Sequence, residues 1–209
     1  TTMVGCAYSI AVTGEPQIIL PEKTPGEVEA VAENPTADGE APFPRVVLST
    51  IHTKWCKKFV GDAFPAIALP SLAQGTSTEV SSLFGSKATV VVFWTKDRWM
   101  SQTALEDLQQ EVASGYELAE VSIVGIAVNV SKREVQQTVA KTQAEFHQLL
   151  DQEGKALAEV GSVALPRIYV LDPTGKIVWF DIEYSESTRR ELLQTVATLA
   201  GDRSPSTSN

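Results

Sequence analysis

Residues 90–101 read Val-Val-Val-Phe-Trp-Thr-Lys-Asp-Arg-Trp-Met-Ser, and this stretch decides the fold. The apolar run Thr89–Trp94 is rich in β-branched residues, which predicts a central strand buried on both faces. Apolar residues then recur at helical spacing from Met100 to Val112. The stretch therefore predicts a buried strand that runs into the start of a helix.

The rest of the chain continues this alternation. The further predicted elements are a strand at Val121–Val130, a helix with a capping box at Ser131 and Glu134, a short helix at Gly154–Val160, strands at Arg167–Leu171 and Ile177–Ile182 joined by a tight turn at Asp172–Gly175, and a last helix opened by Thr188-x-x-Glu191. Crossover helices between parallel strands come first, and an antiparallel hairpin with a closing helix follows. This order predicts an α/β fold, a three-layer α/β/α sandwich around a central mixed sheet.

Composition excludes several classes of function. With 43% hydrophobic residues in 209, the chain supports one well-cored domain plus additional segments. The formal net charge of -9 repels phosphate backbones, so we expect no nucleic-acid partner. The longest apolar stretches are far too short to cross a bilayer, so we expect no transmembrane segment. The two histidines are isolated and no metal-ligand spacing or phosphate loop is present, so we expect no metal and no cofactor.

The chain divides by composition into four parts. In residues 1–45, prolines alternate with acidic residues and apolar periodicity is almost absent. Such a segment does not bury enough surface to offset its ordering entropy, which predicts an extended leader that tethers the domain or wraps a partner. Residues 46–58 are a connecting segment, and Arg45–Ile51 is a candidate edge strand. Residues 59–202 form the domain, and residues 203–209 are a polar tail.

The cysteines, Cys6 and Cys56, both precede the domain. Cys6 follows Met3-Val4-Gly5, which resembles the end of a bacterial lipoprotein signal, so a lipid anchor at Cys6 and an ordinary cysteine are both open. Lysines and a histidine surround Cys56 in sequence, and such neighbours lower the pKa of a thiol. For Cys56, a redox role, a disulfide with Cys6 and an inert thiol remain alternatives.

The order of elements and several short motifs resemble the thioredoxin-like superfamily, in particular its TlpA/ResA and AhpC/TSA-type redoxin branches. The resemblance covers about residues 59–202, and its motifs are specific through their order and spacing rather than singly. The motifs are Val60-Gly61, Pro65, Leu69-Pro70 and Gly75 in the first segment, Leu83, Gly85 and Lys87 before the central strand, Phe93-Trp94 at its end, Gly161–Asp172 around a proline, and Gly175–Val178 in the hairpin.

In this superfamily the helix after the central strand begins with a cysteine, whose thiolate the helix N-terminus stabilises, and a second cysteine lies three residues on. The resemblance aligns these two positions with Arg98 and Ser101. Neither side chain performs thiol–disulfide exchange, and no cysteine lies between Trp94 and Val112. The resemblance therefore implies a redoxin whose active site is degenerate.

The same resemblance implies that Pro166 is a cis-proline and that a protein-binding surface persists beside it. The residues of this predicted surface are Trp94, Asp97, Arg98, Trp99 and Pro166. Other interpretations stay open: Pro166 only shapes the fold, Trp99 caps the edge of the core, and Asp97 is the helix N-cap. A further alternative is an anion pocket at Asp97–Trp99.

Two functional hypotheses follow. The first is a redox-inactive thioredoxin-like domain that serves as a binding or structural module, in the manner of a subunit of a larger assembly. The second is a thiol–disulfide oxidoreductase or peroxidase that uses Cys56 or a partner's thiol, which predicts that Cys56 lies near Trp94 and Pro166. The resemblance and Cys6 together imply an exported protein, in the periplasm, on a membrane anchor or in an organelle lumen.

Overall fold

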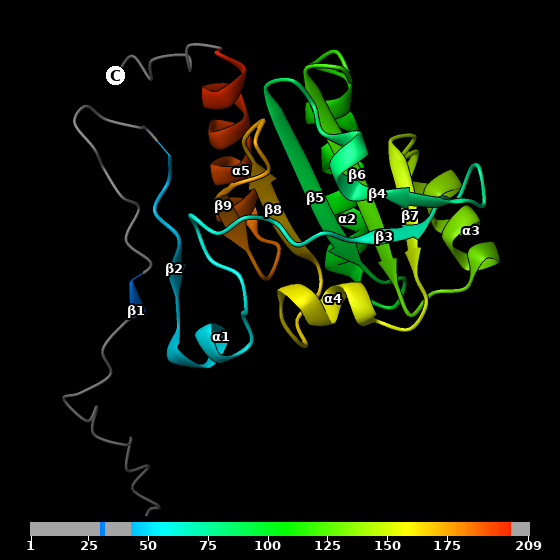
Figure 1. Cartoon of the computed structure of the whole chain (residues 1–209), viewed down its shortest axis with the longest axis horizontal. Helices are drawn as coiled ribbons and strands as arrows, with labels where there is room; N and C mark the ends of the chain where they lie inside the picture. The colour runs from blue at the N-terminus through cyan, green and yellow to red at the C-terminus, as the bar shows by residue number, and fades with distance from the viewer. Residues whose placement is uncertain (1–29, 32–42, 202–209) are drawn as a thin grey trace, which may run out of the picture.

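The computed structural model describes residues 30–31 and 43–201 (Figure 1). The strands are β1 Ala30–Val31, β2 Val47–Leu48, β3 Ala68–Pro70, β4 Ser77–Glu79, β5 Ala88–Trp94, β6 Val121–Val128, β7 His147–Asp151, β8 Arg167–Leu171 and β9 Ile177–Asp181. The α-helices are α1 Thr50–Lys54, α2 Trp99–Asp107, α3 Lys132–Thr142, α4 Lys155–Val160 and α5 Glu186–Ala200, with a 3-10 turn at Val80–Leu83 and a π-helical turn at Leu108–Ala113 that continues α2. The predicted α/β fold with a central mixed sheet is confirmed.

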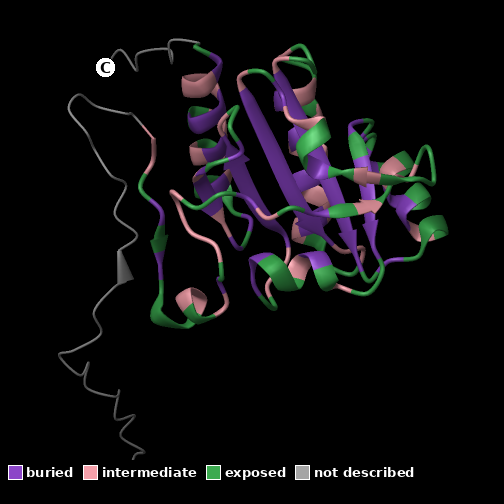
Figure 2. Ribbon diagram, in the orientation of Figure 1, coloured by how far each residue is buried: buried purple, intermediate pink, exposed green. Residues whose placement is uncertain are grey.

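The sheet is built around β5, as its apolar run predicts. The strand order is β7-β6-β5-β8-β9, and β5 pairs in parallel with β6 and antiparallel with β8. Figure 2 shows β5 and β6 buried along their length, which is the pattern expected of strands covered on both faces. The register Phe93↔Arg167 places the end of β5 beside the start of β8. The loops that leave β5 and enter β8 therefore meet at one edge of the sheet.

Layers of helices and loops cover both faces of this sheet. On one face, Arg189 of α5 pairs with Glu111 of the π-helical turn, and Lys141 of α3 donates to Gln102 of α2, so these helices form one layer. On the other face, α4 and the β3–β4 hairpin pass in front of the sheet in Figure 1, while α2 lies behind it. The two layers complete the predicted sandwich.

Strands β7, β3 and β4 have no counterpart among the predicted elements. Strand β7 extends the sheet beyond β6, with the register Ile126↔Leu149. Its sequence does not predict a buried strand, because Gln148 and Asp151 are polar. Both are nevertheless buried in the structure. The β3–β4 hairpin pairs Leu69 with Thr78 and forms a separate two-stranded sheet.

The ends of several elements correct or confirm the predictions. The capping box of Ser131 and Glu134 at the start of α3 is confirmed. Helix α5 begins earlier than predicted, because Ser185 is its N-cap and its side chain accepts from the amide of Thr188. The candidate edge strand at Arg45–Ile51 is reduced to β2, which pairs with β1 and not with the five-stranded sheet.

Most of the predicted leader and all of the polar tail lie outside the described residues, and so does Cys6. The predicted domain boundaries, the tether and the lipid anchor therefore stay predictions. Among residues 30–31 and 43–201, no helix combines the length and the apolar character needed to cross a membrane.

Candidate functional site

The start of α2 carries the first group of predicted site residues. Arg98 is the N-cap, with φ −112° and ψ 117°, and its side chain makes no capping hydrogen bond. This corrects the alternative that Asp97 caps the helix. Asp97 lies one residue too early, and its Oδ1 instead accepts from Nζ of Lys96 at 2.7 Å.

Ser101, the second of the two aligned positions, is a buried structural residue. Its side chain is fully buried, and its Oγ accepts a hydrogen bond from the backbone amide of Thr95 at 3.3 Å. This bond joins the loop after β5 to the first turn of α2. The hydroxyl therefore fixes the strand–helix junction and is not available to a partner.

Trp94 does not reach the surface. Its exposed fraction is 0%, and its indole Nε1 donates to Oε1 of Gln148 at 3.1 Å. Gln148 lies over Gly125, where an added Cβ would stand 2.3 Å from Oε1. This corrects the prediction that Trp94 belongs to the binding surface, because a tryptophan at the end of the central strand is covered on both faces.

The exposed side chains of this junction are Asp97, Arg98 and Trp99. Trp99 leaves 72% of its surface in solvent although it is a large aromatic residue. It therefore does not cap the edge of the core. Tryptophan is enriched among the residues that dominate the binding energy of protein interfaces.

The loop before β8 supplies the second part of the site. The Leu165–Pro166 peptide bond is cis, as the resemblance implies, and Pro166 itself is buried. Val163 and Ala164 have φ values of 51° and 29°, a region that a β-branched residue seldom enters. Val163 is 61% exposed, so the surrounding backbone, not burial of its own side chain, must hold this conformation.

Arg167 anchors this loop to the connecting segment. The guanidinium is fully buried, and Nη2 donates to the carbonyl oxygens of Trp55 and Ser162, each at 3.0 Å. Cys56 and Gly161 form a β-bridge, and the amide of Ser162 donates to the carbonyl of Trp55 at 2.8 Å. Together these bonds hold the segment before the domain against the proline loop.

Cys56 belongs to the same contact. Its Sγ is 3.5 Å from Nη1 of Arg167, and the thiol donates to the carbonyl oxygen of His52 at 3.4 Å. Burial raises the pKa of the Cys56 thiol above its ordinary value, while the Arg167 guanidinium acts in the opposite direction. Nη1 also bonds Oη of Tyr169, a group whose pKa burial raises to about 12. The local environment therefore favours a protonated thiol.

The structure places Cys56 near the residue that follows Pro166 but not near Trp94. Arg167 faces the same side of the sheet as its partner Phe93, and side chains alternate along a strand, so Trp94 points to the opposite side. Cys56 is thus separated by the sheet from the face to which Trp94 belongs. A disulfide with Cys6 stays a prediction, because Cys6 lies outside the described residues.

Sequence reasoning missed Arg167. The available signal was an arginine that opens the strand Arg-Ile-Tyr-Val-Leu, in which the other residues are apolar or aromatic. Ser162 and Tyr169 are close in sequence, but Trp55 and Cys56 are more than a hundred residues away, so these two partners were not readable locally.

Residues 30–31 and 43–201 contain no group of three or more histidine, cysteine or acidic side chains placed to hold a metal ion. The anion pocket at Asp97–Trp99 stays a prediction. The carboxylate of Asp97, 74% exposed in the same short segment, would repel an anion there.

Comparisons with known proteins agree with the fold. A model of the AhpC/TSA family matches residues 60–180. Among curated proteins, no relative matches the sequence.

Several solved structures are similar in fold. One is described as a thiol:disulfide interchange protein DsbE of Chlorobium tepidum, with TM-score 0.61 and 20% identity over 68% of this chain and 99% of that one. Another is the thioredoxin domain of a thiol-disulfide oxidoreductase of Bacteroides vulgatus, with TM-score 0.57 and 19% identity over 69% and 99%. A third is a secreted disulfide oxidoreductase of Mycobacterium tuberculosis, homologous to DsbE of E. coli, with TM-score 0.55 and 24% identity over 63% and 95%. At these identities the likeness is one of fold.

Proposed function

The chain belongs to the AhpC/TSA family of thioredoxin-like redoxins, and from this premise we propose that its domain is a redox-inactive module that binds a protein partner. The binding site is the proline-loop surface, which we define as Asp97, Arg98, Trp99, Val163 and the backbone on either side of Pro166. Its two halves leave the sheet at the same edge, because the end of β5 pairs with the start of β8.

The observation that carries this proposal is the exposed indole of Trp99 at the start of α2. Tryptophan and arginine are the residues that most often dominate the binding energy of protein interfaces. Here Trp99 and Arg98 are both exposed, at the edge of the sheet where the proline loop lies. The surface therefore offers an apolar anchor beside a cation that suits a partner's carboxylate.

The lack of a thiol supports the redox-inactive part of the proposal. The first turn of α2 contains no cysteine, and Ser101 is engaged by the amide of Thr95. A serine hydroxyl neither attacks nor resolves a disulfide, because thiol–disulfide exchange requires a thiolate. We propose that Arg98 and Ser101 stand where related enzymes carry their cysteines.

The enzymatic alternative relies on Cys56 or on a partner's thiol. The contact of Sγ with Arg167 favours it, because a guanidinium stabilises a thiolate. The burial of Cys56, 8% exposed, opposes it by raising the pKa and by limiting access. The net effect leaves a poor nucleophile at neutral pH.

We also propose that the protein is exported. Related folds include a secreted disulfide oxidoreductase of Mycobacterium tuberculosis and a secreted thiol-disulfide isomerase of Corynebacterium glutamicum. In this arrangement residues 1–45 tether the domain, with or without a lipid at Cys6, and residues 59–202 present the proline-loop surface.

The test is a pair of activity assays on the purified chain and on a Cys56→Ser variant. Disulfide reduction with insulin as substrate and peroxide reduction with a thiol donor are measured side by side. We expect no turnover in either protein beyond that of the thiol donor alone. Activity in the parent that disappears in the variant would establish Cys56 as a relocated nucleophile and overturn the proposal.

A further inference from the structure

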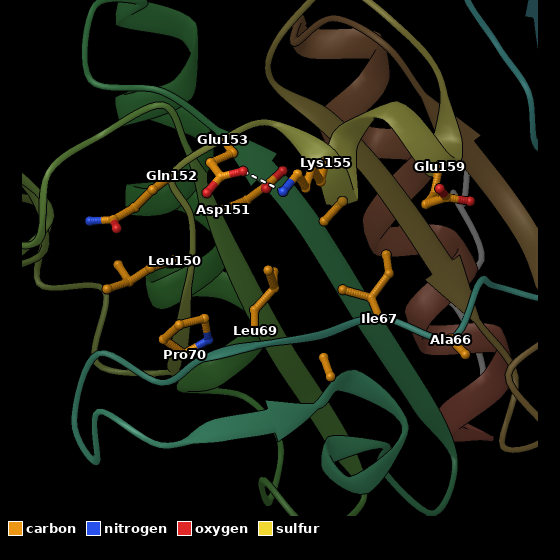
Figure 3. Close-up of a pocket in the computed structure, with 12 residues that line it drawn as sticks. Ala66, Ile67, Leu69, Pro70, Leu150, Asp151, Gln152, Glu153, Lys155 and Glu159 are labelled. Atoms are coloured by element: carbon orange, nitrogen blue, oxygen red, sulfur yellow. Dashed lines mark ion pairs between the residues drawn. The ribbon is translucent and has the colours of Figure 1, made fainter.

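A cavity of about 360 Å³ lies between β3, the end of β7 and α4, away from the residues of the proline-loop surface. One wall is the backbone and side chains of residues 66–70, and the other includes Leu150, Asp151, Lys155 and Glu159. Figure 3 shows Ile67 and Leu69 on the β3 side and Asp151 and Lys155 across from them.

Asp151 is the most informative residue of this cavity. Its exposed fraction is only 2%, and no lysine, arginine or histidine nitrogen of the described residues lies within ion-pair distance of its carboxylate. Its Oδ2 accepts from the backbone amide of Leu157 at 2.9 Å, which fixes the carboxylate at the start of α4. Buried carboxylates in proteins are nearly always paired with a cation. Asp151 has no such partner among the described residues, so the cavity wall presents a carboxylate without a cation.

The other charged residues of the cavity add to its negative charge. Its charged lining residues are Asp151, Glu153, Lys155 and Glu159. Lys155 is engaged by Glu153, as the dashed line in Figure 3 marks. Lys155 therefore does not neutralise Asp151 or Glu159, and the site attracts a cation.

The edge of β3 adds a second element of recognition. The amide of Val80 donates to the carbonyl of Ile67, and Ala68 pairs with Glu79 in the next position of the antiparallel register. Hydrogen-bonded and non-hydrogen-bonded pairs alternate in such a ladder, so the amide and carbonyl of Ala68 point away from β4. In Figure 3 that side of β3 borders the cavity. Within β3 only Ala68 offers both groups on that side, because Pro70 lacks an N–H and the next residue, Ser71, bridges Leu149 of β7. An extended backbone can pair with the sheet there at Ala68.

We propose that this cavity binds an extended segment of a partner protein, whose backbone pairs with Ala68 at the edge of β3 and whose lysine side chain reaches Asp151. The methylene groups of that lysine would pack on Ile67 and Leu69, and its ammonium would pair with the carboxylate. The chain's own leader does not suit the site, because its lysine, Lys23, follows Glu22, which Asp151 and Glu159 would repel, and stands between Pro21 and Pro25, which lack the N–H that strand pairing needs.

The experiment measures binding of an acetylated, amidated peptide Thr-Val-Lys-Val-Thr to the full chain by titration calorimetry. Replacing Asp151 by asparagine keeps an oxygen acceptor for the amide of Leu157 but removes the charge. We expect Asp151→Asn to weaken binding by roughly thirtyfold or more. The matched control is Glu117→Gln, which removes an exposed carboxylate outside the cavity and should leave the affinity unchanged.

Two ligand variants keep the test independent of how the protein variants fold. A peptide with norleucine in place of lysine has a similar apolar stem without the charge, and we expect it not to bind the parent chain. A peptide with N-methylated backbone amides retains the lysine but loses strand pairing, and we expect it to bind more weakly. Equal affinity for either ligand variant, or equal affinity of the parent and Asp151→Asn, overturns the proposal.

Failure here is distinguishable from failure of the proposed function. Replacing Trp99 by alanine alters the proline-loop surface but should leave peptide binding at β3 unchanged. n-Butylamine serves as a free-amine probe: binding as tight as that of the lysine peptide would overturn the part of the proposal that assigns a role to the β3 edge.

Discussion

Nη1 of Arg167 lies 3.5 Å from Sγ of Cys56, and this contact joins the strand after the cis-proline to the segment before the domain. The same guanidinium reaches the carbonyl oxygens of Trp55 and Ser162. In the described residues no carboxylate lies within ion-pair distance of it, so backbone dipoles and the sulfur balance the buried charge. The shape of the proline loop therefore depends on a residue outside the loop itself.

Replacing Arg167 by methionine should lower the free energy of unfolding by about 3 kcal/mol, because the carbonyl of Ser162 loses its buried donor and that of Trp55 keeps only the amide of Ser162. Urea denaturation monitored by circular dichroism measures the change. The matched control is Arg98→Met, an exposed arginine that should change stability by about 0.5 kcal/mol or less. Similar values for the two variants would show that the buried guanidinium does not anchor the loop.

Replacing Gly161 by alanine should also destabilise the protein, by about 2 kcal/mol. An added Cβ would stand 2.2 Å from the carbonyl oxygen of Trp55 and 2.5 Å from Nη1 of Arg167, so the bridge between Cys56 and Gly161 would have to open. Thermal and urea unfolding measure the loss. Ser162→Ala, at an exposed neighbouring position, serves as the control, and an equally stable Gly161→Ala protein would contradict the close packing.

Introducing two cysteines by Arg98→Cys with Ser101→Cys should create disulfide-reductase activity in insulin reduction. The first position is exposed at the helix N-terminus, where a thiolate is stabilised, and the second is buried one turn on. The single variant Arg98→Cys should form mixed disulfides without turnover. An inactive double variant whose two thiols do not form a disulfide on oxidation would show that these positions do not correspond to those of the redox-active relatives.

Asp181 should make the free energy of unfolding fall as the pH rises, the reverse of the usual contribution of an Asp carboxyl. Burial raises the pKa of this carboxyl, although Thr188 donates to Oδ2 and the amide of Ile182 to Oδ1. Because the folded state holds the proton more tightly, the stabilisation from protonation is complete below the unfolded pKa, about pH 4, and is lost as the pH rises through the folded pKa. Compared with Asp181→Asn, the parent should therefore lose relative stability from about pH 4 upward. Urea unfolding of both proteins across this range measures their free energies of unfolding, and a parent that gains stability relative to Asp181→Asn as the pH rises would contradict the sign.

The central part of the fold was predictable because its signals are local. The run Thr89–Trp94 predicts a buried strand from its composition alone. The capping box at Ser131 and Glu134 marks the start of a helix within four residues. Strand β7 was not predictable in this way. Its polar residues Gln148 and Asp151 are buried against Trp94 and the amide of Leu157, partners that only the tertiary structure supplies.

The site was predictable only in part. The cis bond before Pro166 followed from the resemblance, and the buried state of Trp94 contradicted the surface assigned to it. The role of Arg167 depends on two acceptors that precede it in the chain, the nearby Ser162 and the distant Trp55. No pattern of neighbouring residues encodes such a contact.

The pairing of the Cys56 segment with the proline loop has a consequence for biosynthesis. Cys56 leaves the ribosome well before Arg167, from which it is separated by 111 positions. While most of the domain is translated, the connecting segment therefore has no proline loop to pack against. It packs against that loop only near the end of synthesis. During that interval Cys56 is an uncovered thiol, open to oxidants and to passing disulfides, and closure of the finished fold is what withdraws it from them.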